Sequence, residues 1–103
     1  MPVSMQVAYP KTADSTFDKD YYLSTHMALV GEHMGAHIQS TVVTQGFAGG
    51  APGSDAPFHV IATIIFADQA AMDAAMANGG PVVGDIPNFY NAQPVMMVGE
   101  VIG

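Results

Sequence analysis

The side chains best suited to acid–base chemistry in this sequence are Tyr22 and His26. An imidazole titrates near neutral pH, so His26 could accept or donate a proton, and the Tyr22 phenol could orient a substrate oxygen. Both fall in a segment that favours a helix, and at 100° per residue they lie on its apolar side, facing the rest of the fold. A histidine there must be hydrogen-bonded or line a cavity, because an unpaired buried polar group costs about 1–3 kcal/mol.

Apolar neighbours on the same side of this helix are candidates for binding a small molecule. The candidate substrate-binding residues are Met27, Leu29, Val30 and His33. The alternative is that His26 and Tyr22 are hydrogen-bonded core residues with no role in catalysis, and the spacing of the residues leaves both alternatives open.

The remaining histidines carry weaker signals. His33 and His37 have a spacing that can hold a metal on a helix, but Gly35 lies between them and no third ligand is nearby, so we expect no metal site. Near a helix end they would instead favour the local dipole. The roles of His59 and of Glu100, a carboxylate in an apolar strand, stay open.

The other carboxylates have local explanations. Asp18 and Asp20 suit the first turn of a helix. Asp85 and Asn88 flank Pro87, where turn chemistry accounts for them. The glycine-rich segment 46–53 lacks phosphate-binding spacing before a helix, and no flavin or nicotinamide fingerprint is present, so we expect no cofactor.

Composition limits the classes of partner. The chain has 103 residues, two lysines, no arginine and nine carboxylates, giving a formal net charge of -7. Nucleic acids and anionic membranes are poor partners for such a chain, whereas a small apolar molecule is compatible with it. With no cysteine, no signal peptide and no long apolar run, we expect a cytoplasmic protein without disulfides, thiolate metal sites or membrane spans.

Prolines, glycines and apolar periodicity predict an α+β fold in one domain, residues 1–103. The predicted order is strand 3–9, helix 17–34 capped by Thr16 or Asp18, strand 38–47, strand 58–66, a helix capped by Asp68, and strand 95–102, with a short turn opened by Pro81. This β-α-β-β-α-β order is that of the ferredoxin-like unit, a four-stranded antiparallel sheet with helices on one face.

The face of the sheet opposite the helices is expected to be covered. Strands 58–66 and 95–102 carry apolar residues on both sides, whereas a solvated face would be polar. The simplest cover is the same face of a second copy, so we expect a homodimer.

Two runs resemble the EthD family, small proteins named after a bacterial ethyl tert-butyl ether degradation cluster. They are Phe17-Asp18-x-x-Tyr21-Tyr22-x-x-x-His26-Met27-x-Leu29-Val30 and Asp85-Ile86-Pro87-Asn88-Phe89-Tyr90-Asn91 followed by Pro94 and an apolar strand. The likeness covers residues 3–102. It implies a ferredoxin-like unit that dimerises into an α/β barrel, with a cleft between helices and sheet into which His26 points.

The resemblance leaves several functions open. Family members are labelled oxidoreductase-related, and the wider barrel superfamily includes cofactor-free cyclases, decarboxylases, monooxygenases and isomerases. The first hypothesis is a cofactor-free acid–base enzyme acting on a small apolar carbonyl or phenolic compound, with His26 moving the proton and Tyr22 positioning the oxygen. The second is a non-catalytic, ligand-binding accessory protein for an oxidative degradation pathway. A third is haem handling, with His26 or His33 as axial ligand.

Overall fold

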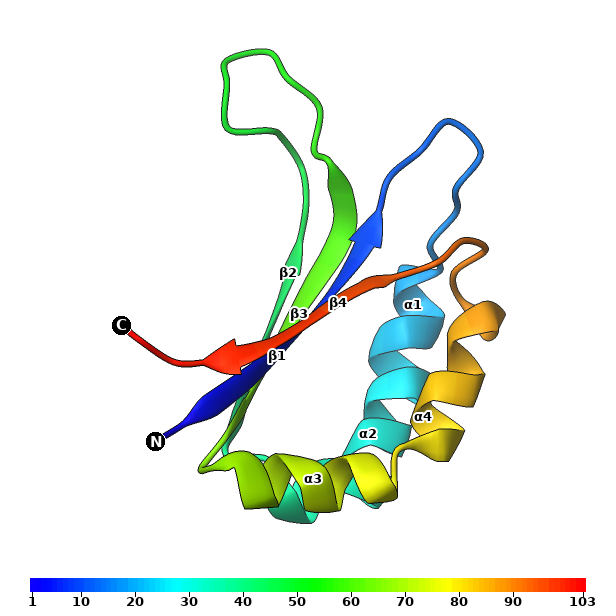
Figure 1. Ribbon diagram of the computed structural model, residues 1–103. Coiled ribbons are helices and arrows are strands. Elements are labelled where there is room, and N and C mark those ends of the chain that lie inside the picture. The colour runs from blue at the N-terminus through cyan, green and yellow to red at the C-terminus, as the bar shows by residue number, and fades with distance from the viewer.

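A four-stranded antiparallel sheet forms one layer of the computed structural model, which describes all residues, 1–103 (Figure 1). Its strands are β1 (Val3–Pro10), β2 (Ser40–Gln45), β3 (Phe58–Phe66) and β4 (Val95–Glu100). They lie in the order β2-β3-β1-β4, with β1 and β3 in the centre. The ferredoxin-like α+β architecture predicted from the sequence is therefore confirmed.

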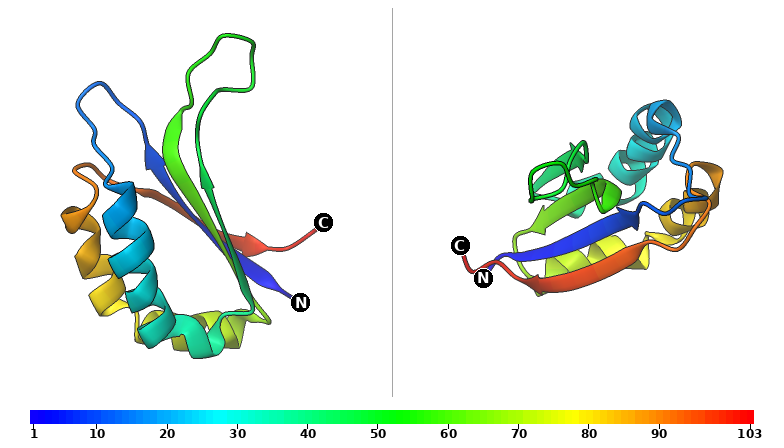
Figure 2. Two further views of the ribbon diagram at one scale, coloured as in Figure 1. Left: turned by 180° about the vertical axis from the view of Figure 1, so that it is seen from behind. Right: turned by 90° about the horizontal axis from the view of Figure 1, so that it is seen from above.

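The helices form the second layer, on one side of the sheet (Figure 2). The first runs without interruption through α1 (Lys19–Tyr21), a π-helical turn (Tyr22–His26) and α2 (Met27–Met34), before a 3₁₀ turn (Gly35–His37). It is followed in the chain by α3 (Gln69–Ala77) and α4 (Gly80–Asp85), and α4 leads into a 3₁₀ turn (Ile86–Asn88). None of the helices is long and apolar enough to cross a bilayer.

Capping residues set most of these boundaries. The carboxylates of Asp18 and Asp68 accept hydrogen bonds from the backbone N–H groups of Tyr21 and Ala71, respectively, so both aspartates cap a helix as predicted. The N-cap of the first helix is therefore Asp18 and not Thr16. Pro81 lies in the first turn of α4, which is a full helix rather than a single turn.

Strand bounds differ modestly from the prediction. Residues 58–66 form β3 as predicted, and β1 includes Pro10. The second strand is shorter at both ends than the predicted 38–47. The N–H group of Ile38 bonds the carbonyl of Gly35 in the 3₁₀ turn, and residue 46 begins the loop. The last strand ends at Glu100, and the N–H group of Val101 bonds Pro2 outside the ladder.

The core lies between the two layers. Burial alternates along β1 and β3, because successive side chains of a strand point to opposite faces. The buried side chains of these strands join others from the helices in one cluster of 17 residues. Its largest fully buried members are Tyr9, Tyr22, Phe66 and Tyr90.

The opposite face of the sheet, here called the open face, is mixed rather than uniformly apolar. The strand register groups its apolar residues: Ala8, Val42, Ile61, Ile65, Val95 and Met97. Polar residues of β1, β2 and β3 share this face, and Thr63 of β3 donates a hydrogen bond of 2.7 Å to Gln6 of β1 near its middle. The expectation that β3 and β4 carry apolar residues on both sides holds.

Hydrogen bonds fasten the start of the first helix to the segment that follows α4. The N–H group of Asp18 bonds the carbonyl of Phe89 at 2.9 Å, and that of Thr16 bonds Oδ1 of Asn91 at 2.8 Å. Phe17 and Tyr90 also form an isolated β-bridge. These contacts fix the first helix beside α4, although the two are distant in sequence.

Candidate functional site

A cleft runs between the helices and the sheet. It is lined by 18 residues, of which 15 are hydrophobic, and these come from both layers. Five of them are methionines: Met5, Met27, Met34, Met76 and Met96. Neither lysine of the chain lines the cleft, so it offers no fixed positive charge to a ligand.

The cleft is narrow. Its cavity volume is about 40 Å³, which is room for a few waters rather than for a metabolite. A larger ligand must displace side chains, and flexible thioethers can move at low cost. The methionine lining therefore allows the cleft to widen around an apolar guest.

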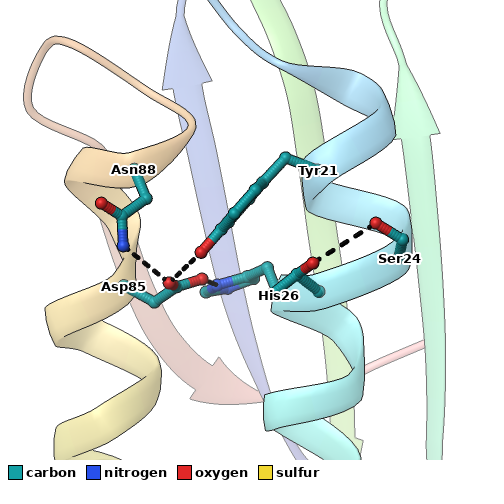
Figure 3. Close-up of polar contacts among 6 residues, drawn as sticks. Tyr21, Ser24, His26, Asp85 and Asn88 are labelled. Atoms are coloured by element: carbon teal, nitrogen blue, oxygen red, sulfur yellow. Dashed lines mark hydrogen bonds and ion pairs between the residues drawn. The ribbon is translucent and has the colours of Figure 1, made fainter.

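His26 meets Asp85 at the wall of this cleft (Figure 3). Its Nδ1 atom lies 3.0 Å from Oδ2 of Asp85, although the two residues are 59 positions apart in the sequence. Both side chains are buried, His26 with 4% and Asp85 with 7% of its surface exposed. The pair links the first helix to the C-terminal end of α4.

Two further donors hold the other oxygen of the Asp85 carboxylate. The hydroxyl of Tyr21 donates to Oδ1 at 2.6 Å, and the amide of Asn88 donates to the same atom at 2.9 Å (Figure 3). The end of a helix is electrostatically unfavourable for a carboxylate, so Asp85 depends on these donors. With Oδ1 occupied in this way, Oδ2 is directed at His26.

Electrostatics make Asp85 a charged acceptor and His26 a neutral base. Burial raises the pKa of Asp85, but the hydrogen bonds from Tyr21, Asn88 and His26 lower it by a larger amount. The pKa of Asp85 therefore lies below its usual value. Burial lowers the pKa of His26 below 6.5, and this outweighs the hydrogen bond and charge of Asp85, which raise it. At neutral pH the pair is therefore a carboxylate and an uncharged imidazole.

This charge state decides which nitrogen of His26 is free. A carboxylate has no hydrogen to give, so Nδ1 must carry the proton and donate it to Asp85. The Nε2 atom then holds a lone pair and has no partner in the chain. Every fully buried side-chain nitrogen and oxygen has a partner, so the unpartnered Nε2 keeps some accessible surface, and the cavity that His26 lines is the cleft.

Aromatic rings hold the imidazole in place. The Tyr22 ring is stacked on it, with centroids 5.2 Å apart and planes 21° apart. Phe89 packs against it at 4.5 Å. These contacts restrict rotation of the ring, so the Nε2 lone pair keeps one direction.

A π-helical turn holds the first two buried residues of the first helix, Tyr22 and His26. In this turn the N–H group of Met27 bonds the carbonyl of Tyr22, five residues back, which widens the helix locally. The buried residues of the helix recur at every fourth position, as Tyr22, His26, Val30 and Met34. The π-helical turn affects only the step from Tyr22 to His26, since Val30 and Met34 lie in α2, a regular α-helix in which residues four apart are offset by about 40°.

Two tyrosine hydroxyls, like Nε2 of His26, have no hydrogen-bond partner in the chain. Tyr9 and Tyr22 line the cleft with 2% of their surface exposed, and neither hydroxyl has a partner in the chain. Since no such atom is sealed off, the small exposed surface of each residue includes its hydroxyl. Burial raises the pKa of Tyr22 to about 12, and burial and the neighbouring Tyr22 and Tyr90 raise that of Tyr9, so both hydroxyls stay protonated.

The structure brings together four of the six residues singled out from the sequence. His26, Tyr22, Met27 and Val30 line the cleft. Leu29 and His33 are half-buried and lie outside its lining. The helical periodicity of 100° per residue therefore overestimated how far round the helix the lining extends.

The interpretation of Asp85 and Asn88 as turn residues holds for their local contact, since Asn88 ends the 3₁₀ turn and bonds Asp85, but it missed the long-range role of Asp85. Asp85 ends a helix, is buried, and joins His26, while Asn88 supports its carboxylate. Tyr21 and Tyr9 were also missed. The sequence did contain a signal for the His26–Asp85 pair. A buried His26 needs a partner, and Asp85 is a carboxylate in a largely apolar stretch, residues 82–90.

The other polar candidates lie elsewhere. His59 forms a 2.8 Å hydrogen bond with Ser15 and stacks on Phe17, outside the cleft. His37 is half-buried and Glu100 is exposed. No group of three histidine, aspartate or glutamate side chains is arranged to hold a metal ion.

The family follows from comparison with known proteins. The family model for the EthD domain matches residues 10–93, which include the whole His26–Asp85 pair and its supporting residues. The chain belongs to the EthD family. Among curated proteins, no sequence matches the chain.

Solved structures agree with this assignment. An EthD-like protein from Ralstonia eutropha superposes with a TM-score of 0.89 at 31% identity, over 99% of this chain and 93% of that chain. An ethyl tert-butyl ether degradation (EthD) family protein from Bacillus halodurans gives a TM-score of 0.77 at 21% identity, over 99% and 100%. The fold they share with this chain is the ferredoxin-like one.

More distant neighbours share the fold alone. SnoaB, a cofactor-independent oxygenase from Streptomyces nogalater, superposes with a TM-score of 0.61 at 9% identity, over 99% of this EthD chain and 94% of that chain.

Replacing three tyrosines with phenylalanine should separate structural hydroxyls from unpartnered ones. The Tyr90 hydroxyl donates to the carbonyl of Pro10 at 2.6 Å, so Tyr90→Phe should lower the free energy of unfolding by about 1 kcal/mol. Tyr9→Phe and Tyr22→Phe remove hydroxyls without a partner and should leave the stability unchanged or raise it. Chemical denaturation measures all three, and a loss for Tyr9→Phe equal to that for Tyr90→Phe would contradict the assignment.

The pKa of His26 should lie below 6.5, because burial outweighs Asp85. An NMR titration of the ring proton on Cε1 measures it, and Asp85→Asn should lower it further by removing the charge that raises it. Since the unfolded chain then binds the proton more tightly, the stability that His26 contributes is present above pH 6.5 and declines as the pH falls below it. A pKa above 6.5 would show that Asp85 dominates over burial.

Proposed function

We propose that this EthD protein binds a small apolar carbonyl or phenolic compound in the cleft and acts on it without a cofactor, with His26 as general base. The observation that carries the proposal is the buried His26–Asp85 pair, whose free Nε2 atom lies at an otherwise apolar cavity. A general base needs a pKa near or below the working pH, and the lowered pKa of His26 satisfies this.

Asp85 has two roles in this proposal. It fixes the tautomer that leaves Nε2 unprotonated, and it stabilises the imidazolium that forms when Nε2 takes a proton. Tyr21 and Asn88 keep the carboxylate oriented for both roles. Tyr22 lies against the imidazole and positions an oxygen atom of the ligand through its hydroxyl.

The composition of the cleft supports a neutral ligand. Its lining contains no lysine or arginine, so a carboxylate or phosphate group would lose its hydration without gaining a counter-charge. The methionines offer polarizable contacts to flat aromatic surfaces.

A second candidate function is ligand binding without turnover. The narrowness of the cleft and its five methionines favour a protein that wraps around an apolar guest. Such a protein would serve as an accessory to an oxidative degradation pathway. In that case His26 would only accept a hydrogen bond from the ligand.

Binding and turnover measurements on matched variants test the proposal. A panel of small aromatic ketones and phenols is screened by thermal stabilisation, and the ligands found are followed for product by NMR. His26→Gln should keep the affinity but lower the turnover rate by about 10²–10⁴-fold. His59→Gln, a histidine hydrogen-bonded to Ser15 outside the cleft, is the control and should leave the rate unchanged.

Two results would count against catalysis by His26. Equal turnover by His26→Gln and the wild type would remove its role as base. Thermal stabilisation by several ligands with no product from any of them would favour the accessory function instead.

We further propose that two copies pair through the open face of the sheet. Support comes from exposed apolar residues on this face, including Val42, Val95 and Met97 with 59%, 56% and 62% of their surfaces exposed. Patches of this kind on one face are typical of an interface, and a twofold axis lets the same patch serve both copies.

Charge substitutions test this pairing. Met97→Glu should convert a dimer of the wild type into a monomer, because it buries two carboxylates against each other across the axis. Leu23→Glu, at a position 55% exposed on the first helix, is the control and should leave the mass unchanged. Light scattering measures the masses, and a wild-type monomer at micromolar concentration would refute the pairing.

A further inference from the structure

Three polar atoms on buried side chains of the cleft have no partner within the chain. They are Nε2 of His26 and the hydroxyl groups of Tyr9 and Tyr22, on side chains with 4%, 2% and 2% of their surface exposed. Every fully buried side-chain nitrogen and oxygen in the molecule is hydrogen-bonded. These three atoms are different, because each is free to bond a ligand in the cleft. Nearly buried polar atoms that lack a partner and line one cavity indicate a ligand that supplies their hydrogen bonds.

The three atoms approach the cleft from opposite layers. Tyr9 belongs to β1, whereas Tyr22 and His26 belong to the first helix. The Tyr9 and Tyr22 rings meet edge to face with centroids 6.0 Å apart, and Tyr22 in turn stacks on His26 at 5.2 Å. A ligand between the layers therefore meets two hydroxyl donors and one basic nitrogen.

We propose that the ligand is a neutral ketone with a hydrogen on the carbon beside the carbonyl, that Tyr9 and Tyr22 hold the ketone oxygen, and that His26 removes the hydrogen as a proton. This inference rests on the base role proposed for His26 and adds the substrate class, the reaction step and a role for Tyr9. The reaction is enolisation.

The step balances without a co-reactant. The C–H bond breaks, and its proton passes to Nε2 of His26, which becomes an imidazolium paired with Asp85. The electron pair of that bond forms a carbon–carbon double bond, and the carbonyl electrons move onto oxygen. The enolate oxygen accepts hydrogen bonds from the two phenols, and return of the proton to the same or another carbon regenerates neutral His26.

The two tyrosines suit this task because they are donors without charge. Burial raises the pKa of Tyr22 and of Tyr9, so each hydroxyl keeps its proton and offers it to oxygen. Hydrogen-bond donors aimed at developing negative charge stabilise the enolate more than the ketone, which lowers the barrier. A carboxylate ligand would gain no cation, so the site selects ketones against acids of the same shape.

Deuterium exchange with 2-tetralone tests the step directly. The wild-type protein in D₂O should accelerate exchange of the hydrogens beside the carbonyl, followed by NMR against a protein-free sample. Tyr9→Phe should lower this acceleration by about 10²-fold, the typical effect of losing one donor to an oxyanion. Tyr90→Phe is the matched control: it removes a hydroxyl from the same aromatic cluster, but one bonded to Pro10, and should exchange like the wild type.

Binding of 2-naphthol, which has the shape of the enol, provides a second readout. The wild type should bind it, Tyr9→Phe should bind it more weakly, and 2-naphthoic acid should bind less well than 2-naphthol to both. These affinities are measured by fluorescence titration on folded protein, so a loss of affinity is not confused with a loss of structure.

The outcomes separate this inference from the proposed base. If His26→Gln loses the exchange while Tyr9→Phe and Tyr22→Phe keep it, the role of the tyrosines is overturned and the base role stands. If 2-naphthoic acid binds better than 2-naphthol, or the wild type neither binds 2-naphthol nor accelerates exchange, the assignment of a ketone is overturned. If all three variants exchange like the wild type, both proposals fail.

Discussion

The contact on which the site depends is the hydrogen bond between His26 and the carboxylate of Asp85. A buried carboxylate is tolerated only where donors surround it, and Asp85 has donors from Tyr21, Asn88 and His26. Each donor comes from the first helix or the turn after α4. The contacts that fasten these segments together, such as the bond from Asp18 to Phe89, therefore also maintain the charge state of the histidine.

This arrangement keeps the polar hydrogen-bond network apart from the apolar cleft within one small fold. The polar network occupies the side of the first helix next to α4, while the cleft beyond it is lined with methionine and branched aliphatic side chains. Only a few polar atoms extend from the wall into the cleft, and they can contact a guest without competition from neighbouring charges. Selectivity of such a site rests on where one oxygen atom of the ligand lies, since apolar contacts alone discriminate weakly between similar shapes.

Local signals in the sequence were sufficient for most of the fold. The apolar strand over 58–66, the cap at Asp68 and the helix end at residue 34 are decided by neighbours along the chain, and the structure has all three. The burial of His26 also followed from helical periodicity. The partner of His26 could not be predicted in this way, because Asp85 is 59 residues distant and local turn chemistry offered a sufficient explanation for it. The π-helical turn likewise has no simple sequence signal.

The most direct measurement of the central claim is the tautomer of His26 in the unliganded protein at neutral pH. Nitrogen-15 NMR distinguishes a protonated ring nitrogen from one with a lone pair, and long-range couplings assign each signal to Nδ1 or Nε2. The account predicts a neutral ring with the proton on Nδ1, hydrogen-bonded to Asp85, and a lone pair on Nε2. A proton on Nε2, or on both nitrogens, would contradict it, because the cleft would then face a donor instead of a base.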